Sequence, residues 1–366
     1  RMPEHRTIRS LGVEAPHKPY FMFYDEGPPQ DGAVQLDALY SGFSAGTELT
    51  FLKDTNPYLR SRWDDGRGVF VEGEPSARFP IPFLGYMEVA RVRQSRAAAF
   101  AEGTVVCGTF GHKSGHTADP FHELLIPLPG DLDPILGIFV AQMGPIAANG
   151  ILHADAEMLG SGGTRLGDGV AGLRVIVIGG GTVGLMTALF ARDAGATVVL
   201  ADPSAFRREK AHALGLTAME EDQAWQHAKA AWHHGPSDRG ADIVFQTRAR
   251  SESLHGALRA LRPQGTVIDL AFYQGGADHT RLGEEFHHNG LSIRCAQINR
   301  VPRGLAHRWD RSRLAGETIR LLSRHGRAIR REMITHIVPV DEAPEFLTRL
   351  VDERPEFLQI VFSFEP

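Results

Sequence analysis

The segment that most limits how this chain can fold is RVIVIGGGTVGLMTALFARDAGATVVLAD, residues 174–202. A run of β-branched residues leads into Gly179, Gly181 and Gly184, which have the spacing G-x-G-x-x-G, and a helix-forming run follows. In such a turn the first glycine permits a tight bend, the second lets the backbone approach a phosphate, and the third lets the helix pack against the strand. The segment therefore predicts a strand–turn–helix–strand unit of a parallel sheet.

The same turn predicts a ligand. The N–H groups in the first turn of a helix have no carbonyl partner within the helix and carry a partial positive charge, so this helix start suits a pyrophosphate. A glycine-rich turn without a ligand is the alternative, but the strand before it and the helix after it favour a binding site. We predict that a dinucleotide is bound by the loop residues Gly179, Gly181, Thr182, Val183 and Gly184.

Asp202 stands at the end of the second strand of this unit. A carboxylate there accepts hydrogen bonds from the 2′-hydroxyl of the adenosine ribose and repels a 2′-phosphate, which favours NAD(H) over NADP(H). Arg207 follows closely, and it either pairs with a 2′-phosphate or is a solvated charge at a helix start. We therefore expect NAD(H) as the cofactor, with NADP(H) as the alternative.

The rest of the chain divides into two kinds of pattern. Residues 32–134 contain short apolar runs separated by Gly and Pro, which predicts a β-rich first domain. Residues 138–156 have helical periodicity and are expected to link two lobes. Strands and helices then alternate, which predicts an α/β Rossmann fold with a doubly wound parallel sheet. The expected strands are 174–178, 197–201, 242–246 and 266–271, the expected helices are 184–194, 206–214 and 252–261, and helices near 313–324 and 343–351 precede a last strand that returns to the first domain.

Composition excludes several classes of protein. A chain of 366 residues suggests two domains, and its 39 Lys and Arg against 44 Asp and Glu give a net charge of −5 without a long basic run, so nucleic acid is not an expected partner. The most apolar stretch, 175–190, is interrupted by three glycines, so we expect no membrane span and a cytoplasmic protein. Cys107 and Cys295 are far apart, form no CxxC motif, and are expected to be buried thiols.

The order of a β-rich first domain, a linking helix, a Rossmann unit and a returning last strand resembles the medium-chain dehydrogenase/reductase superfamily of zinc-type alcohol and polyol dehydrogenases. The resemblance covers essentially the whole chain and rests on GFSAGTE (residues 42–48), PFLGY (82–86), the glycine loop with Asp202, and GTVI (265–268). It implies a GroES-like catalytic domain at 1–146 and 301–366 and a Rossmann dinucleotide-binding domain at 147–300. It also implies a homodimer, formed through an edge strand near Leu291 to Ile298.

The positions that hold the catalytic zinc in such relatives differ here. Ser44 stands at the first ligand position, Tyr86 and Met87 at the second pair, and Gly144 at the third. Hydroxyl groups are poor zinc ligands beside thiolate and imidazole, and glycine offers no donor. The stretch that carries the four structural cysteines in many members contains only Cys107. We therefore expect a zinc-free member with no metal site.

Without zinc, a side chain must stabilise or protonate the substrate oxygen. The resemblance directs Tyr86 and Ser44 to the former metal site and Thr47 to the nicotinamide, and Glu48 either orients a hydroxyl or caps the next segment. His112 is a further candidate acid from a loop that also carries His116 and His122; a solvated loop, or less favoured a metal site of these three histidines, are the alternatives. The predicted catalytic set is Tyr86, His112, Ser44, Thr47 and Glu48, with His287 and His288 as second-tier candidates.

The leading hypothesis is a zinc-independent NAD(P)-dependent dehydrogenase or reductase of a polar carbonyl or alcohol in a small-molecule substrate. The motif SAGTEL (44–49) is similar to the corresponding segment of sugar and polyol dehydrogenases of specialised biosynthesis, including aminoglycoside pathways. This similarity implies a sugar or cyclitol intermediate as the substrate. Reduction of an activated C=C bond, as in enoyl and quinone reductases, is the second enzymatic hypothesis. A dinucleotide-binding sensor without catalysis is the alternative from another class.

Overall fold

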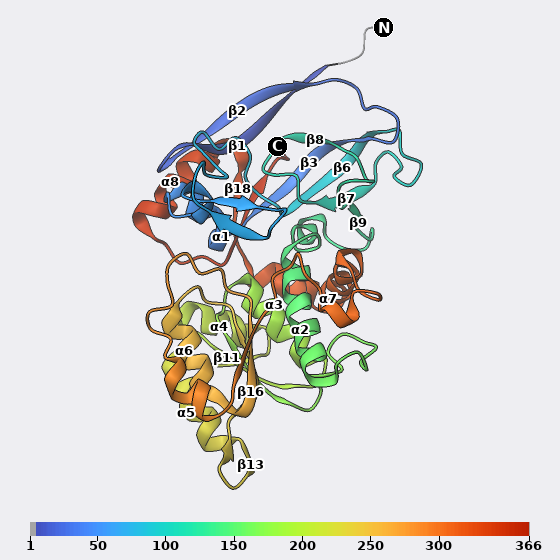
Figure 1. Ribbon diagram of the computed structural model, residues 1–366. Helices are drawn as coiled ribbons and strands as arrows, with labels where there is room; N and C mark the ends of the chain where they lie inside the picture. Colours follow the sequence, from blue (N-terminus) through green and yellow to red (C-terminus); the bar gives the residue numbers. More distant parts are fainter. Residues whose placement is uncertain (1–4, 366) are drawn as a thin grey trace. The chain divides into compact units, whose positions relative to one another are not determined.

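The structure, a computed structural model, describes residues 5–365, which form two compact units. The first unit combines the chain up to Gln142 with Ile334–Pro366, and the second is Met143–Met333. In Figure 1 the strands β1 to β9 of the first unit run from blue to blue-green, its C-terminal segment is red, and the helices of the second unit run from green to orange. The architecture is the expected one, a β-rich domain and a Rossmann-like domain.

The second unit is built on a six-stranded sheet. Its strand order is β12-β11-β10-β15-β16-β17, and every neighbouring pair is parallel. The chain starts in the middle of the sheet and moves outward in both directions, which is the doubly wound arrangement predicted from the alternating pattern. The strands are β10 (Arg174–Ile178), β11 (Thr197–Ala201), β12 (Thr217–Met219), β15 (Ala241–Gln246), β16 (Leu261–Asp269) and β17 (Ser292–Cys295).

Helices flank this sheet, and one cluster of buried residues includes Ile176, Val244, Leu254 and Leu258. The sequence reading did not include β12 or α5, because the only large apolar side chains of residues 217–231 are Met219 and Trp225. The helices are α2 (Met143–Leu159), α3 (Thr182–Asp193), α4 (Ala205–Ala213), α5 (Glu221–Ala231), α6 (Ser251–Ala260) and α7 (Arg311–Glu332), and a small hairpin pairs β13 (His233–Gly235) with β14 (Asp238–Arg239).

The first unit contains a seven-stranded sheet with the order β18-β19-β3-β6-β7-β9, in which β8 also pairs with β3. The C-terminal β19 pairs antiparallel with β3, so the chain does return to the first domain's sheet. The sheet strands are β3 (Val34–Phe43), β6 (Glu88–Ser95), β7 (Val105–Gly108), β8 (Gly115–Ala118), β9 (Ile126–Pro127), β18 (Ile334–Pro339) and β19 (Gln359–Ser363). Two antiparallel pairs, β1 (Arg6–Ala15) with β2 (Lys18–Glu26) and β4 (Arg62–Asp64) with β5 (Val69–Val71), and the helices α1 (Ala45–Leu52) and α8 (Ala343–Glu353) complete the unit.

The division between the units differs from the expected boundaries. The chain enters the second unit at Met143, close to the expected 147, but it leaves at Met333 and not at 300. The reason is α7, which packs against α2 within the second unit. The amphipathic pattern identified α7 as a helix but did not show which core it covers.

Two further expectations concern single features. Cys107 is buried as expected, whereas Cys295 is exposed, because it lies at the end of β17, the last strand of its sheet. No helix within residues 5–365 has the length and apolarity needed to cross a membrane.

Candidate functional site

The glycine loop joins β10 to α3 in the second unit. Gly179 has φ of +107°, a conformation that side-chain-bearing residues rarely adopt, and it turns the chain at the end of the strand. A Cβ on Gly184 would lie 1.7 Å from the carbonyl oxygen of Gly179, so only glycine allows this approach of helix and strand. The first and third glycines therefore have the geometry that the sequence pattern predicts.

The helix α3 begins directly after this turn, with Gly181 as its N-cap and Thr182 and Val183 in its first turn. The nearest atom to a Cβ built on Gly181 is Nη1 of Arg207, at 3.1 Å, so a guanidinium lies beside the start of the helix. An N-terminal helix turn and a guanidinium both attract phosphate oxygens. The residues present therefore fit the pyrophosphate of a dinucleotide.

Asp202 is 3% exposed and both of its carboxylate oxygens accept backbone hydrogen bonds. Gly180 N–H donates to Oδ2 and Ser204 N–H donates to Oδ1, each at 2.8 Å. Asp202 thus connects the glycine loop to the end of β11 by hydrogen bonds. The sequence analysis did not predict this structural role. Hydrogen bonding to a ribose remains a prediction, since a carboxylate has further lone pairs to offer.

Arg207 sits at the start of α4, within a mixed electrostatic environment. Burial lowers the pKa of the Arg207 guanidinium. The negative charge of Asp202 raises this pKa, whereas the positive charge of Arg248 lowers it further. Arg248 itself forms an ion pair with Glu221. Two guanidinium groups that influence each other in this way would both be stabilised by an anionic ligand.

The predicted catalytic residues of the first unit come together in one network. At its centre three hydroxyl groups meet: Ser44 Oγ and Tyr86 OH share a hydrogen bond, and Tyr86 OH donates to Thr47 Oγ1 at 3.2 Å. Ser44 and Thr47 come from the start of α1, and Tyr86 comes from the turn before β6. Ser44 is buried, while Tyr86 and Thr47 are partly exposed.

A buried chain of ionisable groups lies behind these hydroxyls. Glu48 Oε2 accepts a hydrogen bond from the Ser44 N–H at 2.6 Å, and Oε1 pairs with Nε2 of His112. Nδ1 of His112 pairs with Ser41 Oγ, which donates to Glu88 Oε2 at 2.8 Å. The side chains of Ser41, Glu48, Glu88 and His112 are all at most 2% exposed. Glu48 therefore both caps α1 and orients His112, so neither of its two predicted roles excludes the other.

Burial and charge shift the pKa values of this network. Burial raises the pKa of Glu88 to about 7, against the opposing charge of His112. Burial alone would lower the pKa of His112, but the charge and hydrogen bond of Glu48 outweigh it, so the net shift is upward. Burial also raises the pKa of Tyr86, which therefore keeps its proton at neutral pH and can donate a hydrogen bond.

The structure changes the role that His112 can have. Both of its ring nitrogens are already hydrogen-bonded and the residue is 1% exposed, so it has no atom to offer a substrate. His116 belongs to a separate network, in which Nδ1 contacts Lys113 Nζ at 2.8 Å and Nε2 contacts Glu123 at 2.7 Å. His122 is exposed, which leaves no common site for the three histidines. His287 and His288 are exposed as well.

Sequence reasoning missed Ser41 and Glu88. A signal for Glu88 was present, because the alternation of EVARV places it on the same strand face as Ala90 and Val92, which are buried. A carboxylate on an otherwise apolar face predicts a buried charge that needs partners. Ser41 gave no comparable signal, since serine occurs in many buried strands without a special role.

The donor atoms at the positions where the resemblance implies zinc ligands do not fit a catalytic zinc. Ser44 and Tyr86 present hydroxyl groups that hydrogen-bond each other, and Met87 is fully buried in the core. A Cβ on Gly144 would lie 2.1 Å from Cγ2 of Thr318, so this position has no room for a ligand side chain. Thiolate, imidazole and carboxylate, the groups that zinc prefers, are all missing from these positions.

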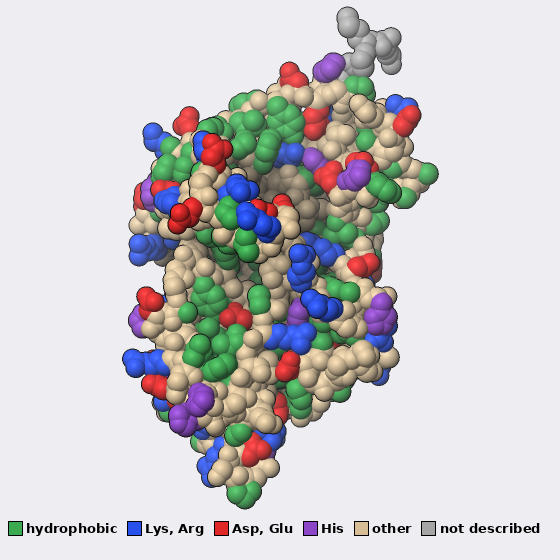
Figure 2. All heavy atoms as spheres, viewed as in Figure 1, with side chains coloured by type: hydrophobic (Ala, Val, Ile, Leu, Met, Phe, Trp, Pro, Cys, Tyr) green, Lys and Arg blue, Asp and Glu red, His purple; other side chains and the backbone are tan. Residues whose placement is uncertain are grey.

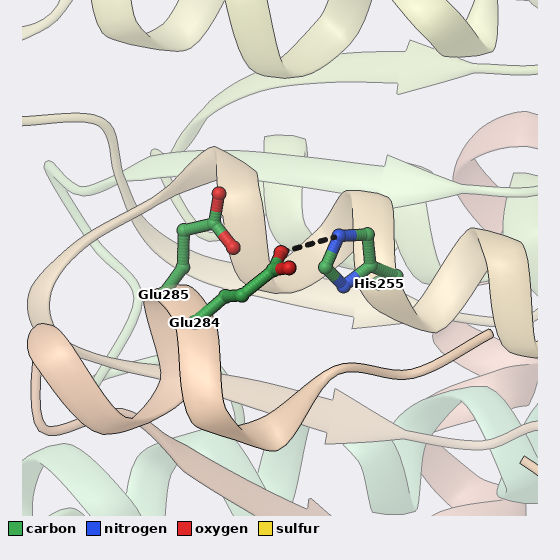
Figure 3. A group of neighbouring side chains, drawn as sticks. All are labelled: His255, Glu284 and Glu285. Carbon is green, nitrogen blue, oxygen red and sulfur yellow. Dashed lines mark ion pairs between the residues drawn. The ribbon is translucent and has the colours of Figure 1, made fainter. Parts of the chain in front are cut away.

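Within residues 5–365, the side chains of His255, Glu284 and Glu285 in the second unit lie close enough together to hold a metal ion (Figure 3). The Arg281 N–H donates to Nδ1 of His255 at 3.5 Å, and Nε2 of His255 lies 3.7 Å from Oε2 of Glu284. Glu285 pairs with Arg259 at 3.4 Å. His255 and Glu285 therefore already have partners in the backbone of Arg281 and the side chain of Arg259.

Comparisons with known proteins agree with this architecture. A family model described as zinc-binding dehydrogenase matches residues 182–307. D-guloside 3-dehydrogenase of Escherichia coli (strain K12) is 25% identical over 366 residues, which cover 95% of this chain and 97% of that protein. Galactitol-1-phosphate dehydrogenase of Escherichia coli superposes with a TM-score of 0.72 at 14% identity, over 97% of this chain and 99% of that one. A Sinorhizobium meliloti 1021 protein solved with NADP bound gives a TM-score of 0.70 at 18% identity, over 98% and 99%.

The chain is thus similar to the zinc-type medium-chain alcohol and polyol dehydrogenases. The family match and the full-length relative are both dehydrogenases, and they identify the chain as an NAD(P)-dependent oxidoreductase, as predicted. The family match lies entirely within the second unit, whereas Ser44, Tyr86 and Met87 lie in the first. The match therefore identifies the nucleotide-binding half of this dehydrogenase and does not bear on its metal positions.

Proposed function

We propose that the protein is a zinc-independent dehydrogenase or reductase that transfers hydride between a nicotinamide and an alcohol or carbonyl carbon of a sugar or cyclitol. The observation that carries the proposal is the group of hydroxyls from Ser44, Thr47 and Tyr86, which occupies the region where zinc-dependent relatives are expected to bind metal. The relatives named for a guloside and for galactitol 1-phosphate support a sugar or polyol substrate.

Tyr86 is the proposed proton donor and acceptor at the substrate oxygen. A bound nicotinamide would give or take the hydride, and the chain must then manage the charge on oxygen. The Tyr86 phenol is protonated at neutral pH, so in the reductive direction it can hydrogen-bond a carbonyl oxygen and give its proton as the alcohol forms. Ser44 and Thr47 hold the phenol in place and can share its proton.

Glu48 and His112 are proposed as positioning residues. Glu48 binds the backbone of Ser44 and the ring of His112, and His112 is connected through Ser41 to Glu88. This chain fixes the start of α1, and with it the two hydroxyls that contact Tyr86. Its negative charge also favours the protonated phenol, since Glu48 and Glu88 both raise the pKa of Tyr86.

We propose NAD(H) as the preferred cofactor and NADP(H) as an accepted one. Asp202 supports NAD(H), because a carboxylate at the end of β11 opposes a 2′-phosphate. Arg207 and Arg248 support some acceptance of NADP(H), and a structural relative was solved with NADP. Titration with NADH and NADPH, followed by metal analysis of the purified protein, tests both the cofactor and the absence of zinc; stoichiometric tightly bound zinc would contradict the proposal.

The central test replaces the phenol. Tyr86→Phe should lower kcat about 10²- to 10⁴-fold, the usual contribution of a positioned acid or base, while the dissociation constant for NADH stays unchanged. Tyr40→Phe is the matched control, because its hydroxyl contacts Glu365 outside the network, and it should leave kcat unaltered. An unchanged kcat in Tyr86→Phe would overturn the role of Tyr86.

Product analysis separates the remaining hypotheses. Reduction with 4-deuterated NADH should place deuterium on the carbon that bears the new hydroxyl. Deuterium on the β-carbon of a retained carbonyl, with the α-carbon taking a proton, would instead identify reduction of an activated C=C bond. Tight NADH binding without turnover of any sugar, cyclitol or enone would favour the dinucleotide-binding sensor.

We also propose that two copies associate through β17. This strand ends the parallel sheet of the second unit, and its free edge offers backbone N–H and C=O groups to another strand. Ile293, which is 38% exposed on β17, would be covered by such pairing.

A further inference from the structure

One arginine of the second unit connects segments that follow different strands of its sheet. Arg248 comes two residues after β15, and its Cγ lies 3.1 Å from a Cβ position built on Gly179, the first residue after β10. Its guanidinium forms an ion pair with Glu221, which begins α5 two residues after β12. Because the sheet has the order β12-β11-β10-β15, the ion pair joins segments on either side of the carboxyl end of β11, where Asp202 lies.

A cavity of about 340 Å³ lies at the same edge of the sheet. Ile178, the last residue of β10, and Pro203, which follows Asp202, both line it, and so do Glu221 and Arg248. Figure 2 shows hydrophobic, acidic and basic side chains close together over α5 and α6, in the view of Figure 1. Under the proposed function the adenosine half of the cofactor lies here, because Asp202 is the residue proposed to recognise its ribose. The Arg248–Glu221 pair then borders the 2′ position.

Two arginines and two carboxylates meet beside the glycine loop. Nη1 of Arg207 lies 3.1 Å from a Cβ position built on Gly181. The charge of Asp202 raises the pKa of Arg207 and the charge of Arg248 lowers it, and such influence acts over short distances only. Glu221 in turn pairs with Arg248. The two carboxylates thus offset two positive charges that a cofactor phosphate would otherwise attract.

Glu221 is held by fewer hydrogen bonds than Asp202. Both carboxylate oxygens of Asp202 accept a backbone N–H, whereas Oε1 of Glu221 is buried without a hydrogen-bond partner among residues 5–365. A buried carboxylate oxygen without a partner is unfavourable, because it has lost its water and gained nothing in return. An anion that competes for Arg248 therefore displaces Glu221 more easily than a competing anion displaces Asp202.

We propose that Glu221 determines the choice between NAD(H) and NADP(H) by holding Arg248. While the carboxylate binds this guanidinium, the guanidinium cannot pair with a 2′-phosphate, so a cofactor with a 2′-hydroxyl is favoured. A cofactor with a 2′-phosphate must replace Glu221 as the partner of Arg248, and breaking that ion pair lowers its affinity. This inference rests on the proposed function and names a residue, in addition to Asp202, that sets its cofactor preference.

The ion pair also connects α5 to the segment after β15, which is a structural role. If connection were the only role, Glu221→Gln would lower the melting temperature and weaken the binding of every adenine nucleotide alike. A role in cofactor choice instead changes the affinity only for nucleotides that carry a 2′-phosphate. The ratio of two affinities is therefore the informative measurement.

Two small nucleotides isolate the 2′-phosphate. Adenosine 2′,5′-bisphosphate and 5′-AMP differ only in that group, and calorimetric titration of the full-length protein gives a dissociation constant for each. Glu221→Gln should strengthen binding of the bisphosphate roughly tenfold and leave that of 5′-AMP unchanged, because the released guanidinium gains a phosphate partner. The double variant Glu221→Gln/Arg248→Gln should lose this gain. An unchanged affinity ratio in Glu221→Gln, or a gain that persists in the double variant, would overturn the proposal.

Asp222→Asn is the matched control, because it removes the same charge from the next residue of α5, which is exposed. It should leave the affinity ratio unaltered, and an equal gain in this variant would show that net charge alone is responsible. NADPH and NADH titrations of Glu221→Gln should repeat the change seen with the small nucleotides, and equal weakening of both would reduce the ion pair to a structural link. Absence of turnover with every substrate would count against the proposed function, whereas the nucleotide affinities would still decide the role of Glu221. Failure of the wild type to bind 5′-AMP would overturn this proposal together with the cofactor site.

Discussion

At the scale of single residues, the buried carboxyl of Glu88 makes the first unit sensitive to pH. The folded protein holds the Glu88 proton up to about pH 7, whereas an ordinary glutamate loses it near 4.5. Between these values the folded state binds more protons than the unfolded chain, so the free energy of unfolding falls as the pH rises, by at most about 3 kcal/mol. The raised pKa of His112 acts in the same direction, because its stabilisation is present below pH 6.5 and is lost above.

Glu88→Gln removes the first of these titrations. We expect the melting temperature of the wild type to fall between pH 5 and pH 8, and that of Glu88→Gln to fall less. Glu356→Gln makes the same chemical change at an exposed position of the same unit and should follow the wild type. Parallel pH curves for Glu88→Gln and the wild type would show that the carboxyl titrates normally in the folded protein.

Gly144, at the position where the resemblance implies a third zinc ligand, gives a second prediction. Alanine at 144 would force a Cβ to within 2.1 Å of the Thr318 methyl group, and such overpacking costs about 1–3 kcal/mol. We expect a lower melting temperature in Gly144→Ala and partial recovery when Thr318→Ala is added. Gly256→Ala is the control, because this helical glycine has no atom within 4 Å of its Cβ position and alanine there should stabilise. A Gly144→Ala protein as stable as Gly256→Ala would contradict the packing.

The sequence predicted members of the site better than their arrangement. Motif positions pointed to Ser44, Thr47 and Tyr86, whose hydroxyls are in contact in the structure, because a family resemblance carries the register of a fold. It could not show that His112 has both ring nitrogens occupied, since that depends on Glu48 and on Ser41, which is 71 residues away in the chain. Side-chain contacts between distant segments are set by tertiary packing, which local spacing does not encode.

At the scale of elements, Asp202 connects β11 to the glycine loop. Asp202→Ala removes the acceptor for two backbone N–H groups, and each hydrogen bond to a charged acceptor contributes about 1.5–3 kcal/mol. We expect NADH affinity to fall roughly tenfold or more, and the preference for NADH over NADPH to decrease, both measured by fluorescence titration. Glu209→Ala, an exposed acidic residue on α4, should change neither quantity. Unaltered NADH binding in Asp202→Ala would remove Asp202 from the cofactor site.

The elements themselves differ in how much the sequence encodes. The strand β10 has the bounds that its β-branched run predicts, Arg174–Ile178, because buried parallel strands need such residues on both faces. β12 is only three residues long and lies at the edge of the sheet, where pairing with β11 and not local composition decides its conformation. Short edge strands are thus the least predictable part of this fold.

At the scale of the whole molecule, the chain crosses between its two units twice, and only one crossing was close to its expected place. The first crossing is marked by a change from strand-like to helical periodicity near residue 143. The second crossing, after Met333, is not marked by a change of sequence pattern, because an amphipathic helix such as α7 could belong to either unit. Its place in the second unit follows from the close fit of Gly144 against Thr318, a contact between residues 174 positions apart.

The last prediction concerns assembly. We expect the protein to be a dimer in solution through its β17 edges, so a lysine at the centre of that strand should prevent pairing by placing two charges in one apolar contact. Ile293→Lys should therefore elute as a monomer when its mass is measured by light scattering after size exclusion. Ile337→Lys is the matched control, because Ile337 is 43% exposed on β18, which ends the sheet of the other unit, and this variant should remain dimeric. A monomeric wild type, or dissociation by Ile337→Lys alone, would reject β17 as the interface.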